Sequence, residues 1–242
     1  MGLFLDLCLL FACGCVAGWV LELFYRRFSP ANGDRKWINP GFCTGPWLPI
    51  YGFGLVTMYL LVSFCTLDFI GNVYLRTGVL FLLMGLCMTA IEFAGGLGLL
   101  KLFHLRLWDY SKEWGNIQGI ICPKFTFFWF LCGVLYYFLL HPLAARAVDM
   151  LRGNLAYSFF VGVFFGVFII DVIHSAGIVA KLRAFAQEHN VVVRYEEVKG
   201  YIRDRYRESK KRYHFLFPFR TEKPLTEHLK ALLDRFEKYV RK

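Results

Sequence analysis

Long apolar runs separated by short polar segments set the pattern of this chain. Five runs approach the roughly 20 residues that a helix needs to cross a bilayer. They cover residues 3–24, 49–70, 79–100, 125–143 and 155–180. Beyond residue 180, apolar residues recur at helical spacing among many charges. The pattern predicts an all-α protein, a polytopic membrane bundle of about five transmembrane helices followed by a helical, basic tail at residues 181–242.

The tail pattern predicts two amphipathic helices. Their apolar positions are Val191, Tyr195, Val198, Ile202 and Tyr206 in the first, and Leu225, Leu229, Leu232, Phe236 and Val240 in the second. Between them, residues 215–219 form an aromatic run bracketed by Lys210, Lys211, Arg212 and Arg220. We expect this tail to lie on the anionic inner leaflet. A hairpin whose two apolar faces pack together is the alternative.

Composition agrees with a membrane protein and identifies the tail as a separate module. Hydrophobic residues make up 57% of the 242 positions, and the formal net charge is +10. The last 62 residues hold 17 of the 28 Lys and Arg against 9 of the 18 acids, a local balance of +8. We therefore expect lipid rather than nucleic acid as the partner of this basic tail. The eight cysteines fall mostly in apolar runs without a Cys-x-x-Cys pair, so neither a disulfide, a metal nor a cofactor is indicated.

Two apolar runs carry a carboxyl within a stripe of small residues. Gly14, Gly18 and Glu22 recur every four residues in the first run. In the third, Gly85, Thr89, Glu92 and Gly96 lie on one helical face. Small residues let helices approach closely, so both stripes should face other helices. Glu22 and Glu92 either mark a functional pathway or only hydrogen-bond to neighbouring segments.

The fifth and the first apolar runs carry further acids and small residues. The fifth carries the pair Gly162 and Gly166, with Asp171 and His174 three residues apart on a different face. Asp6 lies near the start of the first run, where a water-exposed carboxylate costs little, and we assign it no role.

Residues 39–54 predict a packed turn that leads into a helix. Glycines and prolines alternate there with large apolar residues, which is unlike a flexible linker. No regular helix can run through its first half, and Pro49 must sit in a first helical turn. The structural candidates in this stretch are Pro40, Gly41, Gly45, Pro46, Pro49, Tyr51, Gly52 and Gly54.

Residues 101–124 are too polar to cross a bilayer, and their aromatic content indicates an interfacial or re-entrant segment. Together with the acids of the apolar runs, this segment supplies the candidates for a substrate pathway. They are Trp19, Glu22, Glu92, Arg106, Trp108, Asp109, Tyr110, Asn116, Asp171 and His174.

The loops predict the orientation through their Lys and Arg residues. The loop after the first run holds Arg26, Arg27, Arg35 and Lys36, and the loop after the third holds Lys101, Arg106, Lys112 and Lys124. The alternate loops hold only Arg76, and then Arg146 and Arg152. The positive-inside rule places the amino terminus outside and the tail in the cytoplasm. Glu22, Glu92, Asp171 and His174 then gather on the cytoplasmic side.

These motifs carry a family resemblance. Gly18-Trp19-x-x-Glu22, residues 39–54, Glu92, Arg106-x-Trp-Asp-Tyr-Ser111 and Asn116-x-x-Gly119 together resemble the bacterial ABC-transporter type IV permeases, the CmpB-like membrane proteins. The resemblance covers about residues 14–140. It implies a multi-pass permease of the bacterial plasma membrane. The chain has no Gly-x-x-x-x-Gly-Lys-[Ser/Thr] loop, so an ATPase would be a separate subunit.

Three classes of function fit this sequence. A permease component explains acids and broken helices around a cytoplasmic-side site, and a chain of this size would join a second copy or an ATPase. An intramembrane lipid-modifying enzyme would use the acids or His174 for proton transfer, although no nucleophile signature is present. A non-catalytic scaffold or sensor would read anionic lipid through the tail. Whether Glu22 and Glu92 line a path or are sealed by packing separates these classes.

Overall fold

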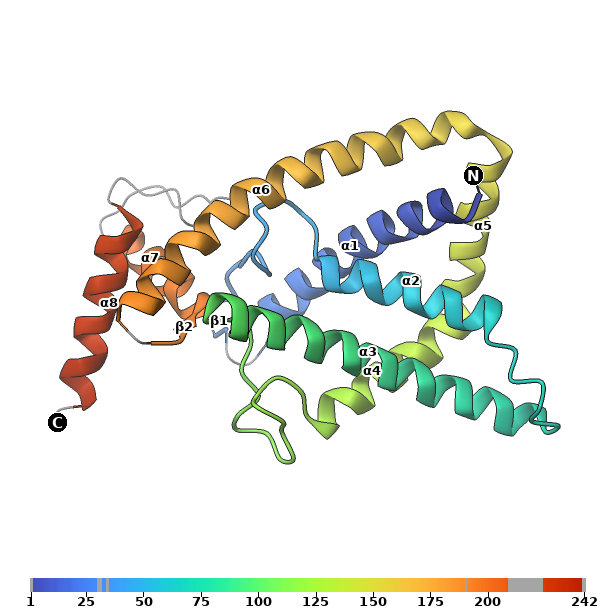
Figure 1. Cartoon of the computed structure of the whole chain (residues 1–242), viewed down its shortest axis with the longest axis horizontal. Helices are drawn as coiled ribbons and strands as arrows, with labels where there is room; N and C mark the ends of the chain where they lie inside the picture. Colours follow the sequence, from blue (N-terminus) through green and yellow to red (C-terminus); the bar gives the residue numbers. More distant parts are fainter. Residues whose placement is uncertain (1, 30–31, 34, 190, 209–223, 241–242) are drawn as a thin grey trace. The chain divides into compact units, whose positions relative to one another are not determined.

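The computed structural model describes residues 2–29, 32–33, 35–189, 191–208 and 224–240, and their regular secondary structure is almost all helix (Figure 1). The membrane-type helices are α1 (Gly2–Phe28), α2 (Pro49–Phe64), α3 (Val73–Phe103), α4 (Pro123–Leu135), α5 (His141–Gly153) and α6 (Ser158–Glu188). Short π and 3-10 turns at Tyr136–Leu140 and Leu155–Tyr157 precede α5 and α6. The tail contains α7 (Tyr195–Glu208) and α8 (Leu225–Val240). Two short strands, β1 (Leu105–Arg106) and β2 (Val193–Arg194), pair in parallel. The predicted all-α class is confirmed.

Among the described residues, four helical segments are long and apolar enough to cross a membrane, judged by length and composition alone. They are Gly2–Phe28, Val73–Phe103, Pro123–Gly153 and Leu155–Glu188. The second predicted span corresponds to α2, which has 16 residues and ends at Phe64 rather than near residue 70. At about 1.5 Å per residue, α2 is shorter than the hydrocarbon core of roughly 30 Å.

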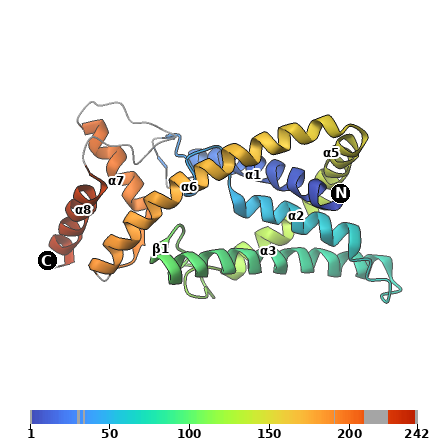
Figure 2. The ribbon, with the colours of Figure 1, turned by 45° about the horizontal axis from the view of Figure 1, so that its top comes forward.

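The chain divides into two compact units. Unit 1 comprises Met1–Glu22, Pro46–Gly95 and Asp109–Phe168, and unit 2 comprises Leu23–Gly45, Gly96–Trp108 and Ile169–Lys242. In unit 1, α2 runs antiparallel to α1, and α4 runs antiparallel to α3 (Figures 1 and 2). Its core includes Leu10 of α1, Met58 of α2, Met84 and Met88 of α3, and Tyr136.

The small-residue stripes of α1 and α3 face neighbouring helices, as predicted. A Cβ added at Gly14 would lie 2.9 Å from Cα of Gly52 in α2. In α3, a Cβ at Gly85 would lie 3.2 Å from Phe130 of α4. Such close approach of two backbones requires residues without bulky side chains. The pair Gly162 and Gly166 differs, because nothing lies within 4 Å of a Cβ added at either.

The core of unit 2 is formed by the last turns of α6 together with the tail. Leu182 and Phe185 of α6 pack with Val198 and Ile202 of α7 and with Leu229 of α8. Where the structure describes their side chains, the apolar residues of both tail helices therefore pack within protein, as in the hairpin alternative, with α6 as an additional partner. The predicted aromatic run at residues 215–219 and its bracketing Lys and Arg residues lie outside the described residues.

Asp6 contradicts the expectation that its carboxylate meets water. Its side chain is 2% exposed and pairs with Arg152 at the end of α5, Nη2 to Oδ2 being 2.6 Å. Nε of Arg152 also donates to Oδ2, at 3.0 Å. The pair thus joins the beginning of α1 to the end of α5 within unit 1.

Candidate functional site

Five side chains of unit 1 contact one another in series, and we call them the carboxyl–aromatic cluster. They are Glu22, Tyr51, Trp129, Glu92 and Tyr110. Glu92 lies on the stripe of α3 that faces α4 and is 4% exposed. Its two carboxyl oxygens accept different donors. The phenol of Tyr110 donates to Oε1 at 3.0 Å, and the indole Nε1–H of Trp129 donates to Oε2 at 3.0 Å.

Tyr51 links the second acid to the same cluster. Its hydroxyl donates to Oε2 of Glu22 at 3.1 Å, and its ring lies edge-on to that of Trp129 with 6.0 Å between centroids. Tyr51 occupies the first turns of α2, directly after Pro49, and its ring fills the space above Gly18. The broken segment before α2 and the small residue in α1 together bring the phenol to Glu22.

Tyr110 is placed by the loop that follows α3. Its ring stacks on Phe125 at 4.2 Å, and its backbone N–H donates to the carbonyl of Gly119 at 2.8 Å. Burial, followed by the charge of Glu92 and the hydrogen bond to it, raises the pKa of the Tyr110 phenol above its usual range. The phenol therefore keeps its proton at physiological pH and acts as a donor to Glu92.

Two predicted pathway residues, Asp109 and Asn116, form hydrogen bonds that shape this loop. Oδ1 of Asp109 accepts the N–H of Ser111, and the amide of Asn116 donates to the carbonyls of Ser111 and Glu113. Oδ1 of Asn116 also accepts the N–H of Gly119 at 3.0 Å. These bonds are typical of residues that shape a turn, so Asp109 and Asn116 position Tyr110 through the backbone.

Unit 2 contains a second polar site around residues 39–45, which we call the clamped loop. The ammonium of Lys199 in α7 donates to the carbonyls of Asn39 at 3.0 Å and Gly41 at 2.6 Å. The hydroxyl of Tyr195 donates to the carbonyl of Phe42 at 3.1 Å. One cation and one hydroxyl from α7 therefore bind three carbonyls of this loop.

The amide side of the clamped loop binds Asp171 of α6. Oδ1 accepts the N–H of Thr44 at 3.2 Å and also the Thr44 hydroxyl, while Oδ2 accepts the N–H of Gly45 at 3.1 Å. The side-chain amide of Asn39 closes the loop on itself by donating to the carbonyls of Cys43 and Thr44. Gly41 adopts a φ of +74°, which favours glycine in this turn.

The remaining candidates occupy other positions. Arg106 lies in β1 opposite Arg194 of β2, and Trp108 follows that strand. Trp19 is half-buried on α1, and His174 is exposed on α6. Of the loop candidates, Pro40 is buried, Gly52 packs against Phe11 and Cys15, and Gly54 packs against Met88. Gly45 donates to Asp171, and Pro46 continues the chain towards Pro49 at the start of α2.

Sequence reasoning missed Trp129, Lys199 and Tyr195. Trp129 lies in the aromatic run 127–130, where nothing distinguishes it from its neighbours. Its spacing could have provided a signal, because Gly133, Trp129 and Thr126 form one face of α4. On that face, Met84 lies beside Gly133, and Thr89 bonds to Thr126 at 3.1 Å. Lys199 is one of many cations in the tail and has no comparable signal.

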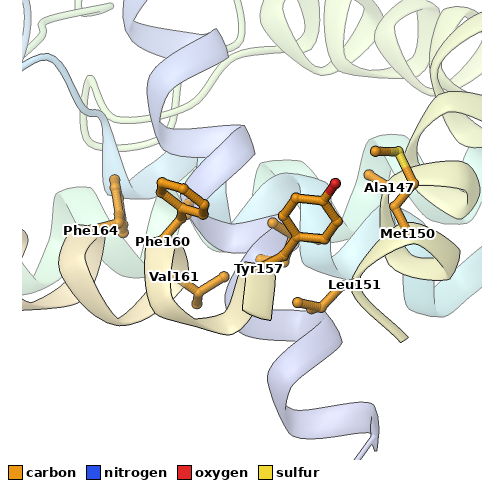
Figure 3. Close-up of a pocket in the computed structure, with 9 residues that line it drawn as sticks. Ala147, Met150, Leu151, Tyr157, Phe160, Val161 and Phe164 are labelled. Carbon is orange, nitrogen blue, oxygen red and sulfur yellow. The ribbon is translucent and has the colours of Figure 1, made fainter. Parts of the chain in front are cut away.

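A separate cavity in unit 1 is apolar. It has a volume of about 280 Å³, and Figure 3 shows side chains of α5 and of the start of α6 around it. The lining residues are Leu9, Ala12, Ala147, Met150, Leu151, Tyr157, Phe160, Val161 and Phe164. No residue of the carboxyl–aromatic cluster is among them, so this cavity does not provide an approach to Glu22 or Glu92. Among the described residues, no group of three or more His, Cys, Asp or Glu is arranged to hold a metal ion.

Comparison with known proteins identifies the family. The model of the family described as "Putative ABC-transporter type IV" matches residues 9–176. The chain belongs to this family. The match continues past residue 140 and includes Asp171 and His174, whereas α7 and α8 lie beyond it. The carboxyl–aromatic cluster falls wholly within the family region. Neither the curated proteins nor the solved structures provide a match.

Proposed function

We propose that this chain is the membrane-embedded permease component of a transporter, with a substrate pathway that passes the carboxyl–aromatic cluster. The observation that carries the proposal is Glu92, a carboxyl 4% exposed in a membrane-type helix, with neutral donors on both oxygens. A carboxylate at the centre of a transmembrane helix costs about 3 kcal/mol, and such groups are typical of transport pathways and proton sites.

The donor pattern supports a charged form of this site. Trp129 can only donate, so Oε2 of Glu92 must be an acceptor in either protonation state. Oε1 accepts from Tyr110 when the carboxyl is ionised, whereas a proton on Oε1 would require the phenol to turn its own hydrogen elsewhere. Both donors can also serve a protonated Glu92 that carries its proton on Oε2, but their hydrogen bonds to the ionised carboxyl are the stronger ones. A permease can use such an acid to attract a substrate group or to exchange a proton.

The proposed orientation places the amino terminus outside the bacterial plasma membrane and the tail in the cytoplasm. Its support is the excess of Lys and Arg after the first and third apolar runs, including Arg26 and Arg27 in the last turn of α1. Glu22 lies one turn before these arginines. In this orientation the carboxyl–aromatic cluster is on the cytoplasmic half of the membrane.

The proposed partners are a separate ATPase subunit, which the family membership supports, and a second copy of the chain. We also propose that the tail is attracted to anionic lipid of the inner leaflet. The burial of Val198, Ile202 and Leu229 leaves charge rather than apolar surface as the basis of this attraction. Exposed cations such as Lys181, Arg183 and Lys230 would supply it, each worth about 1 kcal/mol near the surface.

Replacement of Glu92 by Gln tests the proposed pathway. The amide keeps the volume, accepts from Trp129 through its carbonyl and donates to Tyr110 through its NH₂, so only the charge is lost. We expect cells carrying Glu92→Gln to contain normal amounts of the protein but to show the lipid and metabolite pools of cells that lack it. Asp68→Asn, which changes an exposed acid, is the matched control. Wild-type pools with Glu92→Gln would contradict a pathway through this acid.

A further inference from the structure

We propose that helix α7 acts as a latch on the clamped loop, residues 39–45. In this proposal Lys199 is the principal contact, and withdrawal of α7 releases the loop. The latch does not depend on whether the carboxyl–aromatic cluster carries a substrate, and its contacts all lie within unit 2.

Lys199 is a buried cation on the amphipathic helix α7. It is 4% exposed, whereas Arg194 and Glu197 of the same segment form an exposed pair. Its ammonium lies 4.8 Å from the centroid of the Tyr195 ring and donates to the carbonyls of Asn39 and Gly41. Burial of a charge is costly, and charge-assisted hydrogen bonds with a cation–π contact offset that cost. The docked loop therefore supplies the solvation that Lys199 would otherwise take from water.

Different helices bind the carbonyl groups and the N–H groups of the clamped loop. Lys199 and Tyr195 of α7 bind carbonyls, whereas Asp171 of α6 binds the N–H groups of Thr44 and Gly45. Removal of α7 would leave the amide side bound and expose the carbonyl side to water, which can solvate it. The α7 contacts can therefore release without breaking the Asp171 contacts, as a latch requires.

The clamped loop lies shortly before helix α2 in the chain. Gly45 is followed by Pro46 and, at Pro49, by α2, the helix that carries Tyr51. Prolines at 46 and 49 restrict the backbone of this connection, which is unlike a flexible linker. The latch thus connects the C-terminal module to the segment that enters the membrane.

The thiol of Cys43 reports on the latch. Cys43 lies within the clamped loop and is 3% exposed. We expect Lys199→Met, which keeps the apolar stem, to accelerate labelling of Cys43 by N-ethylmaleimide about tenfold or more, because hydrogen bonds to a charged group are lost. Tyr195→Phe, which removes one neutral hydrogen bond, should accelerate it less. The full chain in lipid nanodiscs is used, and peptide mass spectrometry measures each labelled cysteine.

The same samples contain their own controls. Cys122 is 2% exposed in unit 1 and should label at the wild-type rate in every variant. Lys181→Met removes an exposed cation of α6 and should leave Cys43 protected. Equal rates at Cys43 for Lys199→Met and Lys181→Met would overturn the latch. Parallel acceleration at Cys43 and Cys122 would also overturn it, because that pattern reports general unfolding. If Lys199→Met is not recovered, unchanged Cys43 labelling in Tyr195→Phe decides against the proposal.

Discussion

The ring of Tyr51 lies directly over Gly18, so that a methyl group at residue 18 would sit 2.2 Å from Cγ of that ring. The Tyr51 hydroxyl reaches Glu22 one helical turn further along α1. The absence of a side chain at Gly18 therefore determines where the phenol meets the carboxylate. This relationship makes Gly18 a positioning residue for the carboxyl–aromatic cluster, although it has no polar group of its own.

We predict that Gly18→Ala destabilises the protein by about 1–3 kcal/mol, because the added methyl group forces the aromatic ring or the helices apart. Thermal unfolding in detergent, followed by the loss of monodisperse protein, measures this effect. Gly162→Ala is the matched control, since nothing lies within 4 Å of a Cβ at that position of α6. Equal melting temperatures for the two variants would show that Tyr51 does not pack against Gly18.

Asp6 and Arg152 allow a second test of unit 1. Arg152→Met should lower the melting temperature, because it leaves the carboxylate of Asp6 buried without its cation. The double variant Asp6→Asn with Arg152→Met should recover part of this loss, since no unpaired charge remains. Arg146→Met, at an exposed position of α5, should have little effect. A double variant as unstable as the sum of the two single variants would exclude coupling between these residues.

The helical class and the packed faces could be predicted because they depend on local patterns. Apolar runs specify membrane helices, and four-residue spacing placed Gly14 and Gly18 on one face of α1. The same reasoning identified the face of α3 that carries Gly85 and Glu92. What the spacing could not supply is the partner of each face, because partner choice depends on contacts between residues far apart in the chain.

Contacts between distant residues illustrate this limit. The sequence predicts a water-exposed Asp6, because an acid near a helix end costs little, but the structure pairs it with a cation 146 positions away. The oxygens of Asp171 accept backbone N–H groups of Thr44 and Gly45, which lie 127 and 126 positions earlier in the chain. Backbone donors have no sequence signature. Lys199 was similarly hidden, because a single buried cation cannot be distinguished by sequence from exposed ones in a basic tail.

The last prediction concerns the proposed orientation, and labelling of introduced cysteines tests it. Asn154 lies between α5 and α6, where the orientation places the chain outside, and Asp234 lies in α8 of the tail. The alternating directions of α1 and α2, and of α3 and α4, are compatible with this orientation. We expect Asn154→Cys in intact cells to react with a membrane-impermeant maleimide, and Asp234→Cys to react only after the membrane is permeabilised.

Asn154 and Asp234 are both exposed in the structure, so burial does not explain a difference in labelling between the two variants. The native cysteines provide a constant background, which the wild-type chain measures. Labelling of Asp234→Cys in intact cells would place the tail outside and would remove the basis for a cytoplasmic-side site. Labelling at neither position before permeabilisation would indicate an even number of crossings between Asn154 and Asp234. In that case α6, despite its 31 residues, would not cross the membrane, because it is the membrane-type helix between these two positions.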